Sequence, residues 1–383
     1  MKHSVCHGGA ILAAARATGR RPEDLLDFSS NADSLVEGLT RSLVQAIPYP
    51  YAWYPDDGCW ELVEALAAHH KVDKHQVLVG NGSSELIFLS LQALRPRKVV
   101  LVGPVFGEYL RACRNLGIGY EVYLLDEAKG FALTPDDMAR LNSIPGDMLI
   151  LCTPNNPTTA VYQDLAPLLG RGSRTSILID TTYRAFLYGT PAYAAHGLHH
   201  YASLVPDGTH LLCLQSFTKA YSCPGIRLGY LLAQSETIDR LKAVRAPWMV
   251  SRFAELAGLA FLAHKEAFDR QRHNLPRLRE ALVTGLEQTG FFTHILASDL
   301  HFILAKLGKG HDAAHLQAYL LAQGMVVRSC DADMGMPEGY FRMQVRCEED
   351  NHALIQACDA YVQDYAAHHK KSSGNWGSAK KSL

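Results

Sequence analysis

HLLCLQSFTKAYSCPGIRLGYLL, residues 210–232, is the stretch of sequence that decides the fold. It contains two apolar runs, Leu211–Leu214 and Ile226–Leu232, that lack the strict alternation of a half-exposed strand. Such runs are typical of strands that are buried on both faces of a sheet. Between them stands Lys219, just past the first strand, where the sites of α/β sheets form. A lone lysine exposed to solvent is the alternative interpretation.

The sequence upstream repeats this pattern. Four more short runs of β-forming residues are expected to be strands, at Gln76–Val79, Lys98–Val102, Met148–Cys152 and Ser176–Asp180. Longer stretches between them, such as Ser84–Leu94 and Tyr109–Leu116, read as helices. Apolar strands that alternate with helices predict an α/β domain with a mainly parallel central sheet.

The two ends of the chain lack this alternation. Strand-like runs are expected at Phe302–Leu307, Met325–Arg328 and Phe341–Arg346, followed by a final helix near Glu348–Tyr365. We therefore predict a large domain over residues 46–280. A smaller α+β domain would combine residues 281–367 with an N-terminal arm, residues 1–45. Residues 368–383 are rich in Ser, Gly and Lys without an apolar period, and a disordered tail is expected there.

The composition limits the classes of partner. The 383 residues include 37 Lys and Arg against 38 Asp and Glu, which gives a formal net charge of −1. This balance argues against nucleic acid or an anionic membrane as the main partner, because both require a basic surface. No apolar run approaches the roughly 18 residues of a membrane span, and the first residues lack the layout of a signal peptide.

The cysteines and histidines indicate a reducing compartment and no metal site. Nine cysteines are scattered without a CxxC pair, so reduced, mostly buried thiols in the cytoplasm are expected. Two histidine pairs, His69-His70 and His199-His200, look like metal ligands at first sight. Adjacent residues do not share a helix face, and we interpret these histidines as exposed to solvent.

Three further segments that could take part in catalysis or ligand binding follow predicted strands. Asp180 could cap the next helix, or it could serve as a charge partner for a bound cofactor. Residues 154–157, PNNP, could be an ordinary turn. Residues 80–85, GNGSSE, could simply start a helix, or their free backbone N–H groups and two hydroxyls could cradle a phosphate. Taken singly, these segments leave both alternatives open.

Taken together and in order, the motifs resemble a known family. The series consists of Tyr54-Pro55-Asp56, Gly80–Glu85, Pro104–Tyr109, Pro154–Pro157, Asp180-x-x-Tyr183, Ser216-x-x-Lys219, Arg227 and Arg342. It resembles the fold-type I pyridoxal-phosphate enzymes of the class I and II aminotransferase superfamily, over nearly the whole chain. The resemblance implies the aspartate aminotransferase fold, which is a three-layer domain accompanied by a smaller domain.

The resemblance also implies pyridoxal phosphate as the cofactor, with a catalytic set of Lys219, Asp180 and Tyr183. Lys219 would carry the cofactor covalently and then move protons as general acid or base. Asp180 would keep the pyridine nitrogen protonated, and Phe106, with Tyr109 as the second choice, would stack on the ring. The other cofactor ligands would be Asn156 and Tyr183 at the phenolate oxygen, and Ser83, Ser84, Ser216 and Arg227 at the phosphate.

In this family the tyrosine that matches Tyr54 reaches across a subunit interface to the partner's cofactor phosphate. The resemblance therefore implies a homodimer with shared active sites.

Several segments narrow the resemblance to one branch. Residues 7–11, HGGAI, residues 26–31, LDFSSN, and residues 247–250, PWMV, resemble the threonine-phosphate decarboxylases. The histidinol-phosphate aminotransferases are close relatives of that branch. Membership would imply decarboxylation of an O-phosphorylated amino acid, in particular threonine phosphate to 1-amino-2-propanol phosphate for cobalamin biosynthesis. A histidinol-phosphate type aminotransferase, a decarboxylase of a related phospho- or phosphono-amino acid, and a non-enzymatic cofactor-binding regulator are the alternatives.

The branch grips the phosphate of its small-molecule substrate with arginines and an N-terminal histidine. Arginine suits this task because its planar fork binds oxyanions through two hydrogen bonds. Arg346 is a further candidate, with a surface ion pair to Glu348 or Glu349 as the alternative. The substrate-binding residues implied by the resemblance are His7, Asn31, Asn156, Arg328 and Arg342.

Three departures from the family pattern concern the substrate. Asp33 and Ser34 stand where Asn and Pro are usual, and Thr181 stands where an acidic residue is usual. A carboxylate at Asp33 would disfavour an anionic substrate if it pointed inward. None of the three affects Lys219 or Arg227, so the cofactor chemistry is expected and the substrate stays open.

Overall fold

The middle of the chain folds into one seven-stranded sheet in the computed structural model, which describes residues 9–48, 51–170, 174–297, 299–308, 311–330 and 335–374. In spatial order the strands are β2 (Val77–Gly80), β8 (Gly229–Ala233), β7 (His210–Ser216), β6 (Ser176–Asp180), β5 (Met148–Cys152), β3 (Lys98–Gly103) and β4 (Gly119–Leu124). β8 runs antiparallel to both of its neighbours, and the other pairs are parallel. The prediction of a mainly parallel sheet is confirmed.

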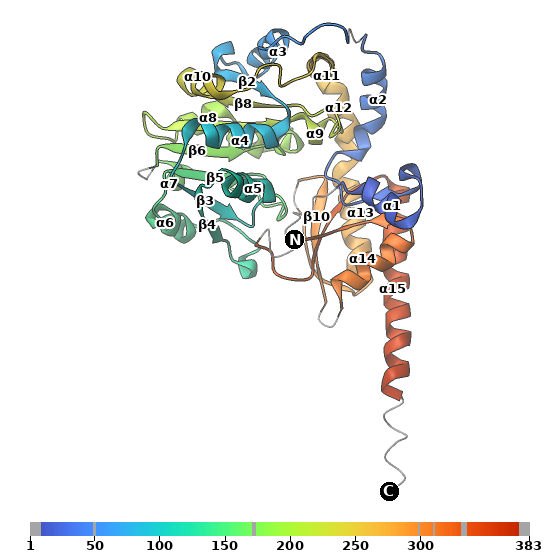
Figure 1. The fold of residues 1–383 in the computed structure, drawn as a ribbon. Coiled ribbons are helices and arrows are strands. Elements are labelled where there is room, and N and C mark those ends of the chain that lie inside the picture. Colours follow the sequence, from blue (N-terminus) through green and yellow to red (C-terminus); the bar gives the residue numbers. More distant parts are fainter. Residues whose placement is uncertain are drawn as a thin grey trace.

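Helices cover both faces of this sheet, which gives the domain three layers (Figure 1). Successive side chains of a strand point to opposite faces, so Leu178 joins one core while Ile177 and Ile179 join the other. The first core is closed by α4 (Gly82–Leu94), α5 (Gly107–Asn115) and α10 (Ser235–Val244). The second is closed by α3 (Trp60–His70), α6 (Pro135–Ser143), α7 (Ala166–Leu169), α8 (Leu198–Ala202) and α11 (Arg252–Ala263). Burial on both faces explains the continuous apolar runs.

Two strands of the sheet differ from the expectation. The sequence does not predict β4, because this edge strand is partly exposed and its residues, GYEVYL, do not form a continuous apolar run. β8 begins at Gly229 rather than at Ile226. Arg227 has a φ of 59°, which lies in the left-handed region, and it interrupts the extended backbone.

A second, mixed α and β part is built from both ends of the chain. β9 (Phe292–Leu296), β10 (Phe302–Leu307), β12 (Arg328–Cys330) and β13 (Tyr340–Gln344) form a four-stranded antiparallel sheet in the order β12-β13-β10-β9. β1 (Leu26–Asp27) pairs in parallel with β11 (Met325–Val326), so the expected run Met325–Arg328 is split between β11 and β12. The core of this part contains side chains of α13 (Leu275–Gln288), α14 (Ala313–Ala322) and α15 (Glu348–Gly374).

The last helix is longer than the sequence predicts. α15 continues past Tyr365 to Gly374 and therefore enters the segment where a disordered tail is expected from residue 368. Ala and Lys, which favour helix, occupy part of this extension, so the helix continues after its apolar period has ended. Residues 375–383 lie outside the described part of the chain. The remaining α-helices of the described residues are α1 (Ile11–Thr18), α2 (Glu37–Gln45), α9 (Phe217–Ala220) and α12 (Lys265–Gln271).

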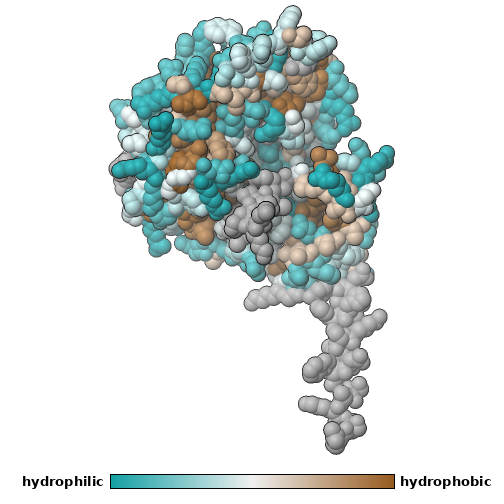
Figure 2. All heavy atoms as spheres, viewed as in Figure 1, coloured by the Kyte–Doolittle hydropathy of each residue, from teal (hydrophilic) through white to brown (hydrophobic). Residues whose placement is uncertain are grey.

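The described surface, helices and cysteines can be compared with the expectations drawn from the composition. Hydrophilic residues cover much of the described surface in Figure 2, and hydrophobic residues are exposed in separate patches between them. No described helix has both the length and the apolar character needed to cross a membrane. The structure describes eight of the nine cysteines as free thiols, and all of these except Cys347 are buried.

Candidate active site

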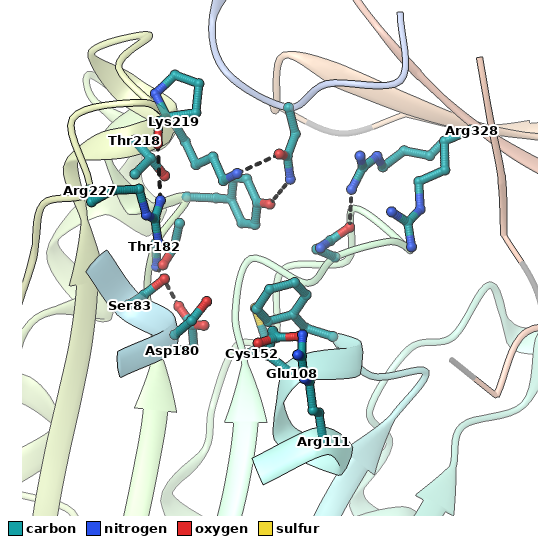
Figure 3. A pocket seen from close by; sticks show the side chains of 17 residues that line it. Ser83, Glu108, Arg111, Cys152, Asp180, Thr182, Thr218, Lys219, Arg227 and Arg328 are labelled. Carbon is teal, nitrogen blue, oxygen red and sulfur yellow. Dashed lines mark hydrogen bonds and ion pairs between the residues drawn. The ribbon is translucent and has the colours of Figure 1, made fainter. Parts of the chain in front are cut away.

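A cavity of about 370 Å³ lies where the carboxyl ends of β5 and β6 face β12 and β13. Figure 3 shows Lys219 and Arg227 on one side of it and Arg328 on the opposite side. Its walls include eleven of the residues that the sequence predicts for the site, namely Asn31, Ser83, Ser84, Phe106, Asn156, Asp180, Tyr183, Lys219, Arg227, Arg328 and Arg342. Tertiary folding therefore brings together residues that are up to about 300 positions apart in the sequence.

The start of α4 forms an end of this cavity that suits an anion. Gly82 has a φ of 81°, and a Cβ there would clash with the Arg227 guanidinium, so glycine lets the arginine approach the helix N-terminus. At Gly229 a Cβ would lie 2.9 Å from the backbone nitrogen of Ser83, so this position also needs glycine. Free N–H groups at a helix N-terminus and a guanidinium both favour an oxyanion. Ser83 and Ser84 line the same end.

Lys219 lies on α9 with its amine inside the cavity. Its Nζ donates a hydrogen bond to Asn31 Oδ1 at 2.6 Å. Burial, together with the charges of Arg342 and Arg227, lowers the pKa of Lys219 to about 7, although the Asp180 carboxylate acts in the opposite direction. A lysine with this pKa is about half neutral at pH 7, which is the form that attacks a carbonyl carbon.

Asp180 ends β6 with a buried and well-anchored carboxylate. Its Oδ1 accepts a hydrogen bond from the backbone nitrogen of Thr182 at 2.9 Å, and its Oδ2 accepts one from the Tyr109 hydroxyl at 2.6 Å. Burial raises the pKa of Asp180, and these hydrogen bonds and the Lys219 charge oppose that rise. A carboxylate held in this way can stabilise a protonated ring nitrogen.

Tyr109 therefore does not lie where it could stack on a ring in the cavity. Its side chain is fully buried, it does not line the cavity, and its hydroxyl is engaged by Asp180. Its ring packs edge-on against Phe106, with the ring centroids 5.6 Å apart. Phe106 does line the cavity. The geometry leaves Phe106 as the aromatic side chain available to a ligand ring on this side.

Arg328 and Arg342 form the wall opposite Lys219. They stand directly across from each other on the paired strands β12 and β13. Arg342 is 2% exposed and donates to Asn156 Oδ1 at 2.7 Å and to the Ser29 carbonyl at 2.6 Å. Burial and the charge of Arg328 lower the pKa of Arg342. An oxyanion between the two guanidinium groups would offset their repulsion.

These residues fit a cofactor that carries a phosphate, a carbonyl carbon and a ring nitrogen. The α4 N-terminus and Arg227 suit the phosphate, Lys219 suits the carbonyl carbon and Asp180 suits the nitrogen. Tyr183, whose hydroxyl accepts a hydrogen bond from the Asn31 amide, has a pKa raised by burial and stays a neutral donor. The cradle that Gly82 leaves open is the strongest single sign of the fit.

The departures from the family pattern do not put negative charge into the cavity. The Asp33 carboxylate is fully buried and pairs with Arg272, with Oδ2 and Nε 2.7 Å apart. The Thr181 hydroxyl donates to the Leu214 carbonyl at 3.0 Å and accepts a hydrogen bond from Gln215. Neither side chain lines the cavity, so the concern that Asp33 repels an anionic substrate does not apply to this geometry.

Besides Tyr109, three described candidates from the sequence, Ser216, Tyr54 and Arg346, do not line this cavity. The Ser216 hydroxyl lies 2.8 Å from that of Thr218, which lines the cavity in its place. Tyr54 is 82% exposed and contacts the Trp248 ring. Arg346 pairs with Asp350 at 2.8 Å, which is a different carboxylate from the two considered as its alternative. His7 lies outside the described residues.

Six lining residues were not predicted from the sequence: Pro224 and five that Figure 3 labels, namely Glu108, Arg111, Cys152, Thr182 and Thr218. Helical spacing could have indicated Glu108 and Arg111, because they follow Phe106 at the start of a helix, and their charged groups lie 3.5 Å apart. Cys152 and Thr182 lie at or just past the ends of the predicted strands Met148–Cys152 and Ser176–Asp180.

The surroundings of the two histidine pairs differ from the expectation at one position. No group of three or more His, Cys, Asp or Glu side chains suited to a metal occurs among the residues that the structure describes. The interpretation of all four histidines as solvent-exposed is wrong for His70, which is half-buried and hydrogen-bonded to the Tyr230 hydroxyl at 2.9 Å. Burial lowers the pKa of His70 to about 3, so its ring is neutral.

Comparisons with known proteins give the same family as the motifs. The family model "Aminotransferase class I and II" matches residues 30–360. Threonine-phosphate decarboxylase of Salmonella typhimurium is 31% identical over 363 residues, which cover 92% of this chain and 95% of that protein. Histidinol-phosphate aminotransferase of Desulfitobacterium hafniense is 28% identical over 313 residues, which cover 79% and 82% of the two proteins.

A solved structure supports the fold assignment. Histidinol-phosphate aminotransferase from Clostridium acetobutylicum superposes with a TM-score of 0.77 at 24% sequence identity, and the match covers 89% of this chain and 100% of that chain. The expected fold is confirmed by this likeness.

Proposed function

This chain belongs to the class I and II aminotransferase family, and we propose that it uses pyridoxal phosphate to decarboxylate an O-phosphorylated amino acid. L-Threonine O-3-phosphate is the proposed substrate, and 1-amino-2-propanol phosphate, a precursor for cobalamin biosynthesis, is the proposed product. Support comes from the threonine-phosphate decarboxylase that matches almost the full chain at 31% identity. When bound, pyridoxal phosphate supplies an electron sink for the bond that breaks at the substrate Cα.

The observation that carries this proposal is the presence of two separate cationic regions in one cavity. Arg227 and the start of α4 form one region, and Arg328 and Arg342 form the other (Figure 3). The cofactor phosphate would occupy the first region. The second would then hold the substrate phosphate, with Asn31 beside it and His7 contributed by the N-terminus.

Holding the substrate by its phosphate favours loss of the carboxylate. An aminotransferase clamps the substrate carboxylate with an arginine in the plane of the ring, so that the C–H bond points out of the plane and breaks. Here Arg328 and Arg342 would grip the other end of the substrate, and the carboxylate would be free to turn out of the plane. Lys219, with a pKa of about 7, would return a proton to Cα after CO₂ leaves.

The test is incubation of the protein and pyridoxal phosphate with threonine phosphate in the absence of any 2-oxo acid. We expect release of CO₂ and an equal amount of 1-amino-2-propanol phosphate. Arg342→Gln should raise KM for threonine phosphate roughly 10- to 100-fold, because a charged hydrogen-bond partner of the substrate is lost, and the variant should still bind the cofactor covalently. Unphosphorylated threonine should be a poor substrate of the parent and the variant alike.

A different result would identify the competitor. If turnover requires 2-oxoglutarate and produces glutamate, the protein is an aminotransferase and the proposal fails. If serine phosphate or a phosphonate analogue is decarboxylated at a higher kcat/KM, the reaction class stands and the substrate assignment is wrong.

We further propose that two copies of the chain form a dimer with shared active sites. Four aromatic side chains in one region are largely exposed. Tyr51 (85% exposed), Trp53 (75%) and Tyr54 (82%) are close in sequence, and Trp248 (52%) contacts Tyr54. Large exposed aromatic side chains in one region are typical of an interface. Since Tyr54 lies outside its own cavity, its hydroxyl is available to the cofactor phosphate of a second copy.

Tyr54→Phe tests this arrangement. Loss of the hydroxyl should weaken the binding of pyridoxal phosphate about tenfold, while sedimentation velocity should still show a dimer. Tyr51→Phe is the matched control, because it removes the same group from a neighbouring exposed tyrosine. A monomeric parent protein, or equal effects of the two substitutions on cofactor affinity, would refute the shared site.

A further inference from the structure

Each residue of the segment Asn31-Ala32-Asp33 is anchored by a side chain that is distant in sequence. The Asn31 carbonyl accepts a hydrogen bond from His301 Nε2 at 2.7 Å. The Ala32 carbonyl accepts one from Gln344 Nε2, and the Asp33 carboxylate pairs with Arg272. His301 is the residue before β10, Gln344 is the last residue of β13, and Arg272 begins the short 3-10 helix Arg272–Asn274 that precedes α13. The segment is therefore fixed along its whole length.

This segment in turn holds Lys219 at its backbone carbonyl and at its side-chain amine. The backbone nitrogen of Asp33 donates to the Lys219 carbonyl at 2.9 Å. The Lys219 Nζ donates to Asn31 Oδ1 at 2.6 Å, and the Asn31 amide nitrogen donates to the Tyr183 hydroxyl. A displacement of the segment would therefore move the hydrogen-bond acceptor away from the lysine amine.

Arg272 supports the segment directly. Its side chain is 8% exposed, its Nε lies 2.7 Å from Asp33 Oδ2 and its Nη1 lies 3.1 Å from Asp269 Oδ1. Asp33 Oδ1 is used separately, since it accepts a hydrogen bond from the Leu35 backbone nitrogen at 3.1 Å. Removing one member of a buried ion pair leaves an uncompensated charge, so the partner must move or bind a proton.

Arg272 also supports the segment by a second route. Its guanidinium lies 5.3 Å from the centroid of the Phe186 ring, and that ring stacks on His301 with the centroids 3.8 Å apart. Burial lowers the pKa of His301 to about 3, so the ring is neutral, and its Nε2 must carry the proton that the Asn31 carbonyl accepts. Arg272 thus pairs directly with one end of the segment and, through the Phe186 ring, packs behind the histidine that supports the other end.

We propose that Arg272 is a positioning residue for Lys219, acting through Asp33 and His301 to hold the Asn31 amide oxygen against the lysine amine. This inference rests on the proposed function only for its kinetic readout. It also gives a reason for the departure at position 33, because Asp33 and Arg272 form a matched pair in this chain.

The experiment measures how fast the cofactor-free full-length chain captures pyridoxal phosphate as a function of pH, together with kcat and KM for threonine phosphate and Tm. The variants are Arg272→Gln, Arg272→Lys and Asp33→Asn, where the last keeps an oxygen for the Leu35 nitrogen. Arg174→Gln is the matched control, because Arg174 is also 8% exposed and, among the described residues, bonds to Leu141, Asn142 and Ile144, none of which lines the cavity.

The parent should capture the cofactor with a midpoint near pH 7. In Arg272→Gln the midpoint should fall by roughly 0.5 to 1 pH unit, because the ammonium form loses its acceptor, and kcat should fall about 10- to 100-fold with little change in KM. Arg272→Lys should recover part of both effects, and Asp33→Asn should show a smaller shift. Arg174→Gln should lower Tm without moving the midpoint or kcat.

A purely structural role would give a different pattern. If Arg272→Gln lowers Tm but keeps the parent midpoint and kcat, as the control does, the proposal is wrong. Should Arg272→Gln fail to fold, an unchanged midpoint and kcat in Asp33→Asn would overturn it equally. If the parent shows no decarboxylation while the capture midpoint still shifts in Arg272→Gln, the proposed function fails and the positioning role stands.

Discussion

Lys219→Ala is expected to lower kcat by about 10³-fold or more and to abolish the absorbance of covalently bound pyridoxal phosphate. The physical reason is that Lys219 is placed both to capture the cofactor and to move protons, and a positioned acid–base group alone contributes about 10²- to 10⁴-fold. Its amine faces the cavity with a pKa lowered to about 7, so the neutral form is available near pH 7. The measurement is an absorbance spectrum followed by a decarboxylation assay.

Lys242→Ala is a suitable control, because Lys242 is exposed on α10 and does not line the cavity. It should keep the spectrum and the rate of the parent. A covalent cofactor band that survives in Lys219→Ala and is trapped by borohydride would show that another amine holds the cofactor.

Asp180→Asn is expected to lower kcat by about 10²- to 10³-fold, which is the usual cost of losing one preorganised electrostatic contact. The amide keeps the shape of the carboxylate and removes its charge, so the ring nitrogen of the cofactor loses the partner that keeps it protonated. The amide oxygen can still accept from the Thr182 backbone nitrogen, and the Tyr109 hydroxyl can accept from the amide nitrogen instead of donating, so both neighbours should retain their places. Kinetics and the absorbance of the loaded protein measure the effect together.

Asp207→Asn, at an exposed position outside the cavity, controls for the change of charge. If Asp180→Asn retains the rate of the parent while Lys219→Ala does not, Asp180 has no electronic role and serves only to end its strand.

The core strands of the sheet could be predicted because burial leaves a local mark on the sequence. Met148–Cys152 and Ser176–Asp180 are buried on both faces and coincide with the predicted runs. β4 lies at the edge of the sheet, where partial exposure permits polar residues, and the local pattern is lost. The start of β8 was placed too early because a single residue, Arg227, leaves the extended region.

The site could be predicted in outline for a related reason. Residues that follow parallel strands meet at one edge of the sheet, so Asp180, Asn156 and Lys219 could be grouped before their positions were known. The choice between Ser216 and Thr218 could not be made in this way, because it depends on which hydroxyl faces the cavity. The direction of Asp33 was equally undetermined, since its partner Arg272 lies 239 positions further along the chain.

The sequence by itself determined the α/β architecture, the lysine and carboxylate at strand ends, and the resemblance to one enzyme family. These features follow from local periodicity and short motifs, which a few neighbouring residues are enough to define. Only the tertiary structure decided which charges face the cavity and which are paired away from it. Tyr109 beneath Asp180 and Asp33 against Arg272 are examples, because hydrogen bonds and ion pairs between distant segments depend on distances that chain order does not contain.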